Sequence, residues 1–395
     1  MRILTVHNRY QAPGGEDVVF RNEWEILAAA GHSVQGYVRD NREIACGVYA
    51  RMRLTACTVW SQQSRRALQA LLRQDQPDIA HFHNTFPLIS PSAYYACQQA
   101  GVPVVQTLHN YRLLCPAATF FRVGCVCEQC VECGLWQGVR HNCYRNSLAA
   151  TAAVATMLAV HRGMRTWSEQ VNVYIALTEF ARRKFIEGGL PAEKIVVKPN
   201  FVHPDPGPRE EISDYALFVG RLAPEKGVRT LLSAWRLLRS RIPLCIVGNG
   251  SLRPEPEDRA TELCAPIFLG HLSREQTMQT IKGARLLVFP SEWYECFPLT
   301  LVEAFACGVP VIASRLGAME EIVADGRTGL HFTPGDPEDL AAKVEWAWTH
   351  PAAMAEMGRA ARAEYEAKYT AARNYQMLME IYRGVTKRET GGMNQ

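Results

Sequence analysis

Residues 286–314 read LLVFPSEWYECFPLTLVEAFACGVPVIAS, and this stretch decides the fold class. LLVFPS predicts a strand and EWYECF a loop, while PLTLVEAFAC predicts a helix that ends at Gly308, before VPVIAS forms a second strand. Two apolar strands joined by a helix form a parallel β–α–β unit, in which the strands are buried on both faces. The stretch therefore predicts an α/β fold built on a parallel sheet.

The same alternation of apolar strands and helical stretches runs along the whole chain. Strands are predicted at Arg2–His7, Ile79–His83, Val102–His109, Tyr174–Thr178, Tyr215–Val219, Leu244–Val247, Ile267–Leu269, Leu286–Phe289 and Val309–Ser314. Helical stretches are predicted at Glu16–Ala30, from Pro337 to Tyr369, and at Ala371–Val385. Because 395 residues are too many for one ordinary core, we predict two doubly wound, Rossmann-like domains with a cleft between them. FVHPDPGPREEISD, which follows Asn200, has the composition of a linker.

Composition and charge exclude several classes of protein. The chain is 48% hydrophobic and 21% charged, as soluble globular proteins are, and its net charge of +4 is too small to indicate nucleic-acid binding. No apolar run reaches the roughly 18 residues of a membrane-spanning helix, so we expect a cytoplasmic protein. The apolar run Ser147–Val160, flanked by arginines, predicts either a buried helix or one lying at a membrane surface. Peripheral contact with the inner face of the cell membrane therefore stays open.

Two carboxylates in the opening stretch predict a ligand site. The helix that begins at Pro298 presents free N–H groups of Leu299 and Thr300, and a helix N-terminus attracts anions such as phosphate. Glu295 lies in the loop before these amides, and Glu303 lies one to two turns inside the helix. A carboxylate can accept hydrogen bonds from two neighbouring hydroxyls, as ribose offers. The alternative is that Glu303 pairs with a core arginine and Glu295 is solvated.

Further strand ends carry residues suited to a phosphate ligand. Arg221 and Lys226 follow a strand in LFVGRLAPEKG and suit a diphosphate, although they could equally be solvated loop cations. IVGNGSL at 246–252 and LGHLS at 269–273 add two more strand ends. Gly14 and Gly15 follow the first strand and allow close approach of the backbone to a phosphate, although a plain turn explains them as well. The glycine spacing is not G-x-G-x-x-G, so a hydride-transfer dinucleotide site is disfavoured.

Histidines also stand where strands of the first half end. DIAHFHNTF at 78–86 and QTLHNYR at 106–112 place His81, His83 and His109 there, with Asn84 and Asn110 beside them. If the sheet is parallel, the three histidines face the predicted cleft, and Asn84 and Thr85 could contact an acceptor. The alternative is that each histidine is a structural residue whose ring nitrogens form hydrogen bonds within the fold.

Six of the thirteen cysteines fall between Cys115 and Cys143. Cys127 and Cys130 have the spacing of a metal chelate, and with Cys115 and Cys143 they could form a closed structural zinc site. Cys125 and Cys133 are rival ligands. Reduced or disulfide-linked thiols and an iron–sulfur cluster remain alternatives. We predict zinc as a structural ion.

Four segments carry a resemblance to a known family: GRLAPEKG, the E-x7-E pair of Glu295 and Glu303, FACGVPVIAS and EEIVADGRTGLHFTPGD. They resemble the retaining, GT-B-fold nucleotide-sugar glycosyltransferases of group 1 type, in particular the polysaccharide-building branch. The resemblance runs from the Gly-Gly loop to the final helix and is most specific in the second half. The chain departs from the family at Gly317-Ala318, where Gly-Gly is common, and at PNFVHP, where PNGVD is common.

The resemblance implies roles for individual residues. It implies that Arg221 and Lys226 bind the donor diphosphate, that Glu295 contacts the donor sugar, that Glu303 holds the ribose, and that His109 lies near the reaction centre. The full set of donor-binding residues expected is Gly14, Gly15, Gly248, Asn249, His271, Phe297, Pro298, Leu299, Thr300 and Glu303. His83, Asn84 and Asn110 are expected to contact the acceptor. The family arrangement also predicts an acceptor-side domain at residues 1–202, a donor domain at residues 203–371, and a final helix, 372–395, that packs back on the first domain.

We therefore expect a metal-independent, retaining hexosyltransferase that uses a UDP- or GDP-linked sugar. Its acceptor would be a glycan or a polyprenyl-linked saccharide in exopolysaccharide, capsule or O-antigen synthesis. A front-face displacement, in which the departing phosphate helps to deprotonate the acceptor hydroxyl, is the expected mechanism. A GT-B-fold nucleotide-sugar epimerase and a non-catalytic nucleotide-sugar binding protein are the alternatives. The sequence does not name the sugar, the base, the linkage or the oligomeric state.

Overall fold

The computed structural model describes residues 1–11, 14–45, 47–239, 241–253 and 266–392. The chain divides into two compact units. The N-terminal unit comprises Met1–Phe120, Cys127–Pro199 and Asn374–Gln395, and the C-terminal unit comprises Phe121–Val126 and Asn200–Arg373. The division at Pro199 and Asn200 falls beside the domain boundary expected at residues 202 and 203. The acceptor and donor roles expected of the two domains stay predictions.

A six-stranded parallel sheet forms the centre of the N-terminal unit, in the order β2-β1-β3-β4-β7-β8. Its strands are β1 (Arg2–Arg9), β2 (Ser33–Asp40), β3 (Ile79–Asn84), β4 (Val104–Thr107), β7 (Val173–Ala176) and β8 (Ile195–Val197). The helices assigned to this unit are α1 (Gly15–Ala29), α2 (Val48–Val59), α3 (Gln62–Asp75), α4 (Ser92–Gln99), α5 (Gln129–Glu132), α6 (Trp136–Arg140), α7 (Leu148–Gly163), α8 (Thr166–Glu169), α9 (Glu179–Glu187) and α16 (Ala371–Gly392).

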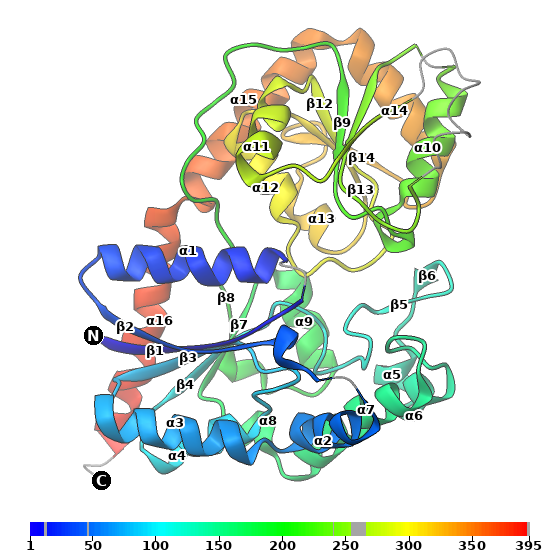
Figure 1. Cartoon of the computed structure of the whole chain (residues 1–395). Helices are drawn as coiled ribbons and strands as arrows, with labels where there is room; N and C mark the ends of the chain where they lie inside the picture. The colour runs from blue at the N-terminus through cyan, green and yellow to red at the C-terminus, as the bar shows by residue number, and fades with distance from the viewer. Residues whose placement is uncertain (12–13, 46, 240, 254–265, 393–395) are drawn as a thin grey trace. The chain divides into compact units, whose positions relative to one another are not determined.

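Helices cover both faces of this sheet (Figure 1). On one face, Leu27 of α1 and Leu378 and Tyr382 of α16 pack against Ile3 and Ile79 of the sheet. On the other face, α3 and α4 lie side by side (Figure 1). The C-terminal helix therefore completes the core of the unit that the N-terminus begins.

The C-terminal unit holds a second six-stranded parallel sheet, in the order β11-β10-β9-β12-β13-β14. Its strands are β9 (Ala216–Val219), β10 (Leu244–Val247), β11 (Ile267–Gly270), β12 (Leu286–Phe289), β13 (Val311–Ser314) and β14 (Gly329–Phe332). Its helices are α10 (Val228–Leu237), α11 (Arg274–Gly283), α12 (Leu299–Ala306), α13 (Ala318–Ile322), α14 (Pro337–Thr349) and α15 (Pro351–Lys368). A short hairpin, β5 (Phe121–Arg122) and β6 (Cys125–Val126), is also assigned to this unit.

Alternate residues of each strand point to opposite faces of the sheet, and both faces are apolar. In β9, Phe218 packs with α10 and α14, whereas its neighbour Leu217 packs on the other face with α12 and α15. This two-sided burial is what a parallel sheet requires. The predicted fold class, two doubly wound α/β domains, is confirmed.

Several elements differ from the sequence predictions. The helical stretch expected from Pro337 to Tyr369 is two helices, because Pro351 has no N–H to continue α14 and instead begins α15. Pro298 is the residue before α12 rather than its first helical residue. β2, β8 and β14 were not predicted. Among the described residues, no helix is both long enough and apolar enough to cross a membrane.

Candidate functional site

The strand order of the C-terminal unit creates a place for a ligand. From β9 the chain proceeds to β10 and β11 in one direction, and from β12 it proceeds to β13 and β14 in the other. Doubly wound sheets bind ligands at such a switch point, beyond the carboxyl ends of the strands. Arg221 and Lys226 follow β9, and Glu295 lies in the loop that follows β12. The structure thus places three predicted site residues at the β9/β12 switch point.

The helix after this loop presents free amides, as predicted. α12 begins at Leu299, with Pro298 as its N-cap, so the N–H groups of Leu299 and Thr300 have no acceptor within the helix. Glu303 lies in the second turn of α12. Within the described parts of the chain, its carboxylate has neither a hydrogen-bond nor an ion-pair partner. Burial raises the pKa of Glu303, and the charge of Arg274 opposes this shift. The alternative of a core arginine paired with Glu303 is therefore not observed among the described residues.

Glu295 is buried and paired rather than solvated. Its Oε1 atom accepts hydrogen bonds from Lys226 Nζ at 2.6 Å and from Ser291 Oγ at 2.8 Å. The Lys226 ammonium also lies 5.1 Å from the centre of the Trp293 ring. Two residues predicted for the same ligand site, 69 positions apart in the sequence, are thus in direct contact.

Other predicted donor residues follow the ends of β9, β10 and β11 or precede α12. Arg221 is exposed and pairs with Glu225. Asn249 follows β10, where its side chain accepts a hydrogen bond from Arg253 at 3.1 Å. His271 is exposed directly after β11. The ring of Phe297, before α12, lies edge-on to Tyr369 with centroids 6.0 Å apart.

Gly248 shows why a glycine is needed beside the switch point. Its φ is +133°, and a Cβ atom there would lie 1.9 Å from the carbonyl oxygen of Gly220. The ends of β9 and β10 therefore approach each other more closely than any side chain allows. Any side chain at position 248 would therefore collide with the backbone at the end of β9.

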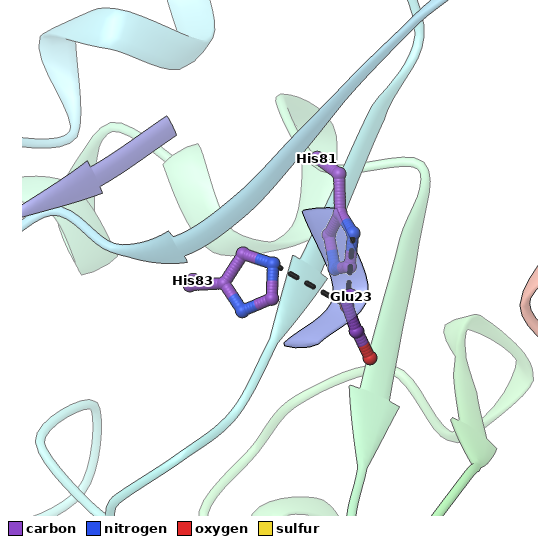
Figure 2. Close-up of side chains that lie close together, drawn as sticks. All are labelled: Glu23, His81 and His83. Atoms are coloured by element: carbon purple, nitrogen blue, oxygen red, sulfur yellow. Dashed lines mark ion pairs between the residues drawn. The ribbon is translucent and has the colours of Figure 1, made fainter. Parts of the chain in front are cut away.

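The N-terminal unit holds a buried group of ionisable side chains. Glu23 Oε1 accepts a hydrogen bond from Lys198 Nζ at 2.7 Å, and both side chains are at most 2% exposed. Glu23 Oε2 lies 3.5 Å from His83 Nε2 and 3.7 Å from His81 Nδ1. Figure 2 shows both imidazole rings beside this carboxylate. Within the part of the chain that the structure describes, these three residues are the one group of three or more potential metal ligands whose atoms lie within 4.8 Å of one another.

The surroundings of this group disfavour a metal ion. Lys198 already neutralises Glu23, and a cation bound there would be repelled by the buried ammonium. Both nitrogens of His81 are engaged at 2.8 Å, one with the Tyr382 hydroxyl and the other with the Thr107 hydroxyl. Burial lowers the pKa of His81 to about 4 and holds that of His83 well below 6.5, so both are neutral at pH 7. The group is a neutralised buried ion pair, and His81 is structural.

His83 also connects this group to His109. The two rings are stacked, and His83 Nδ1 and His109 Nε2 lie 3.0 Å apart, within hydrogen-bond distance. Burial holds the pKa of His109 well below 6.5. His109 is therefore a neutral imidazole, fixed in orientation by its neighbour at the carboxyl end of β4.

Glu16 is a residue of this site that the sequence did not reveal. Its carboxyl group accepts hydrogen bonds from Asn84 at 3.0 Å and from Asn110 at 3.4 Å, so it joins two predicted acceptor-binding residues. Burial, and then the charge of Asp17, raises the pKa of Glu16 to about 8. A glutamate in the first turn of a helix is ordinary, so no sequence signal marked it.

Gly14 and Gly15 lie at the start of the first helix, where Gly15 is the first residue of α1. Gly14 is the N-cap of α1, and its N–H donates to the Asp17 carboxylate at 2.8 Å. Asp17 Oδ1 in turn lies 2.9 Å from His7 Nε2, which is fully buried. The start of α1 is thus tied to β1 through a side chain of its own first turn.

The cysteines of residues 115–143 are only partly brought together. A hydrogen bond from the Cys130 thiol lowers the pKa of Cys115, so these two are in contact. The backbone N–H of Cys127 donates to Phe120 at 2.7 Å, and that of Cys143 to Gly138 at 3.1 Å. Among the described residues, no three thiols lie within 4.8 Å of one another. The four-thiolate zinc site stays a prediction.

Comparison with known families covers both units. Residues 14–200 match the model of the glycosyl transferase 4-like domain, and residues 203–364 match the model of the glycosyl transferases group 1 family. The chain belongs to the group 1 glycosyltransferases. Its Lys226–Glu295 pair and its α12 amides fall inside the matched group 1 region.

Individual relatives of this glycosyltransferase differ in how much of it they match. The glycogen synthase of Mycobacterium tuberculosis is 38% identical over 40% of the chain and 38% of its own length. The sulfoquinovosyl transferase SQD2 of Arabidopsis thaliana is 25% identical over 91% of the chain and 65% of its own length. The chain thus spans less than two thirds of these curated relatives.

Solved structures confirm the GT-B type of fold. The structure of HepE from Anabaena, determined in complex with UDP and glucose, covers 96% of the chain and 99% of its own with a TM-score of 0.65. Its sequence identity is 18%, so the likeness concerns the fold alone.

Proposed function

We propose that the chain is a retaining glycosyltransferase that moves a hexose from a UDP- or GDP-linked sugar to a glycan or polyprenyl-linked acceptor. Synthesis of exopolysaccharide, capsule or O-antigen is the setting we infer. The family membership supports the reaction class. The similar protein HepE was crystallised with UDP and glucose, and other relatives are named as a glycogen synthase and a D-rhamnosyltransferase, which supports a nucleotide-sugar donor.

One observation carries the proposal: the carboxylate of Glu303, a half-buried residue in an otherwise apolar helix, has no hydrogen-bond or ion-pair partner among the described residues. Removing a carboxylate from water without giving it a hydrogen bond is costly even when the burial is partial, so proteins rarely keep one without use. The free amides of Leu299 and Thr300 lie one turn before it on the same helix. A nucleoside diphosphate offers phosphate oxygens to the amides and ribose hydroxyls to the carboxylate.

In the proposed mechanism, the C-terminal unit stabilises the leaving group. Arg221, Lys226 and the amides at the start of α12 hold the diphosphate while Glu303 accepts hydrogen bonds from ribose hydroxyls. The bond between the sugar C1 and the phosphate oxygen breaks as the acceptor oxygen bonds to C1 on the same face. The acceptor proton passes to the departing phosphate. Protein cations neutralise the developing charge, so the reaction as proposed uses no metal ion.

The contact between Lys226 and Glu295 has a place in this mechanism. A bound diphosphate competes with the Glu295 carboxylate for the Lys226 ammonium, which lies 2.6 Å away. Loss of that partner would leave Glu295 as an acceptor for hydroxyls of the donor sugar. The ion pair thus keeps both groups neutralised until the donor arrives.

Other roles remain proposals. We assign the neutral imidazole of His109 to the sugar-transfer step, and Gly14, Gly15, Gly248, Asn249, His271 and Phe297 to donor binding. Cytoplasmic location with peripheral membrane contact, and a structural zinc held by Cys115, Cys127, Cys130 and Cys143, are likewise inferred. The metal content of protein purified without added metal tests the zinc site directly.

Replacement of Glu303 by glutamine tests the proposed donor site. The amide cannot accept both ribose hydroxyls as a charged group does, so the affinity for UDP or GDP should fall about tenfold to a hundredfold. Isothermal titration of the full chain with UDP, GDP and their hexose derivatives measures this loss. Glu345→Gln, an exposed site on α14, is the matched control and should leave binding unchanged.

The titration also has a contrary outcome. Equal affinity of wild type and Glu303→Gln for every nucleotide bound would remove Glu303 from the site. If the wild-type chain binds neither nucleoside diphosphate, the proposed function itself is wrong.

A further inference from the structure

A cavity of about 640 Å³ in the N-terminal unit lies outside the donor site and has a lining suited to an amphiphile. Its wall contains apolar side chains such as Ile44, Leu54 and Val154. It also contains three arginines: Arg51, Arg112 and Arg145. Aspartate and glutamate are both absent from its described lining. A site of this kind favours a ligand with an anionic group and an apolar part.

The cationic end of the cavity is built by Arg112 and Arg145. The Arg112 guanidinium lies over the rings of Phe86 and Tyr144, at 4.3 and 4.9 Å from their centres, and Arg145 lies 5.5 Å from the Tyr144 ring. Arg112 Nε is buried without a hydrogen-bond partner among the described residues. Guanidinium groups bind phosphate through several N–H groups at once, so this end suits a phosphate or diphosphate.

The N-terminus of α7 adds to the same end. Ser147, its N-cap, and Ala149 and Ala150 of its first turn line the cavity. The partial positive charge at the start of a 16-residue helix attracts anions and acts together with the two arginines.

The apolar end lies between α2 and α7, which pack against each other. Leu54 of α2 and Ala153 and Val154 of α7 supply its wall. The small alanine side chain leaves the space that a longer residue would fill. The same two helices expose large apolar side chains outside the cavity, among them Met52 (66%) and Leu148 (60%).

The cavity adjoins the predicted acceptor residues. Thr58, Phe86 and Arg112 line both it and a smaller pocket that holds His83, Asn84, His109 and Asn110. Tyr10, also in the cavity wall, lies with its hydroxyl 3.5 Å from Asn110 Nδ2. A head group attached to a phosphate on Arg112 would therefore lie beside the residues predicted to contact the acceptor.

We propose that this cavity binds the lipid carrier of the acceptor, with its phosphate ester on Arg112 and Arg145 and its isoprenoid chain between α2 and α7. The proposal rests on the proposed function and gives its acceptor a chemical class: a polyprenyl phosphate or diphosphate carrying a saccharide. Both parts of the ligand are needed, because the arginines recognise the phosphate and the helix walls recognise the chain.

Binding of model compounds to the full chain tests the two parts separately. Farnesyl diphosphate should bind at least tenfold more tightly than either farnesol, which lacks the charge, or inorganic diphosphate, which lacks the chain. Equal affinity for inorganic and farnesyl diphosphate would overturn the proposal, as would equal affinity for farnesol. Vesicles of anionic phospholipid should not displace farnesyl diphosphate; full displacement would assign the cavity to bilayer lipid instead.

Paired variants locate the binding site. Ala153→Phe fills the cavity, whereas Ala159→Phe places the same ring on the exposed side of α7. Arg51→Gln and Arg53→Gln form a second pair on α2, of which only Arg51 lines the cavity. We expect each cavity variant to weaken farnesyl diphosphate binding about tenfold, and each control to leave it unchanged. If, in both pairs, the cavity variant and its control change farnesyl diphosphate binding equally, the ligand does not bind in this cavity.

Nucleotide binding, measured in the same samples, separates this proposal from the proposed function. Ala153→Phe and Arg51→Gln should bind UDP or GDP as wild type does, and this would also show that they are folded. A chain that binds a nucleotide but not farnesyl diphosphate would refute the lipid-carrier site and leave the donor site standing. A chain that binds farnesyl diphosphate but no nucleotide would refute the proposed function instead.

Discussion

Two glutamates, Glu23 (buried) and Glu303 (half-buried), show how a single residue acquires a structural role or a function. Glu23 is neutralised by Lys198 at 2.7 Å and surrounded by neutral histidines, whereas Glu303 has no partner in the described parts of the chain. The sequence singled out Glu303, because a charge in an apolar helix is unusual. It could not single out Glu23, since the ammonium that explains it lies 175 positions away.

Lys198→Met tests the structural role of the Glu23 pair. The substitution leaves the Glu23 carboxylate buried without its counter-ion, so the free energy of unfolding should fall by about 3–5 kcal/mol. Urea unfolding measures the loss. The double variant Lys198→Met with Glu23→Gln removes both charges and should recover much of the stability; if it is no more stable than Lys198→Met alone, the pair is not what stabilises this region.

The buried histidines predict a pH dependence of stability. Burial lowers the pKa of His81 to about 4, whereas the unfolded chain binds this proton near pH 6.5. Stability is therefore fully present above pH 6.5 and is lost as the pH falls toward 4, at up to about 1.4 kcal/mol per pH unit for this histidine. His83 and His109, with pKa values also well below 6.5, add to the same slope.

Urea unfolding between pH 7 and pH 4.5 measures this slope. His81→Gln should reduce it, while His350→Gln, which changes an exposed histidine, should not. A slope that stays the same in His81→Gln would mean that folding does not lower the pKa of His81.

At the scale of elements, the sequence predicted central strands well and edge strands poorly. β10 (Leu244–Val247) and β12 (Leu286–Phe289) have the bounds predicted, because continuous apolar runs mark strands buried on both faces. β2 was missed because SVQGYVRD is a half-exposed edge strand with little apolar sequence, and β14 because GLHF is short and begins with glycine. The edge strand β11 (Ile267–Gly270) was nevertheless predicted, because its apolar residues form a continuous run.

Gly227, at the start of α10, tests how tightly the donor-side elements are packed. Its φ is +68°, and a Cβ atom there would lie 1.8 Å from the Pro290 carbonyl oxygen, beside the β12 end. Gly227→Ala should therefore lower the free energy of unfolding by well over the roughly 1–2 kcal/mol that a left-handed alanine costs by itself. Gly326 has a similar φ of +74°, and a Cβ atom there would have no heavy atom within 4 Å. Gly326→Ala therefore measures the cost of the left-handed conformation alone.

Thermal and urea unfolding of the two alanine variants provide the comparison. The Cβ of an alanine at position 227 would push the Pro290 carbonyl group, and with it the end of β12, away from α10. Because Glu295 lies in the loop after β12, Gly227→Ala should also weaken nucleotide binding. Equal stability of the two variants would show that Gly227 is required for its backbone conformation and not for close packing.

For the whole molecule, the two-domain α/β architecture and the group 1 family could be predicted, because repeated strand–helix alternation and contiguous motifs carry them. The sequence predicted that Lys226 and Glu295 bind the same ligand, but it did not predict that they contact each other. Glu16 and the cavity lined by Arg51, Arg112 and Arg145 could not be predicted. Their side chains come from segments far apart in the sequence, and each residue is ordinary in its local context.

We propose that the C-terminal unit activates a nucleotide sugar for transfer with retention. Release of nucleoside diphosphate from a panel of UDP- and GDP-hexoses, with the anomer of the product determined by NMR, tests it most directly. The wild-type chain should release one nucleoside diphosphate and form an α-linked product from an α-linked donor, and Lys226→Met should lower kcat about 10²–10³-fold. A β-linked product from that donor, or an undiminished kcat in Lys226→Met, would contradict it.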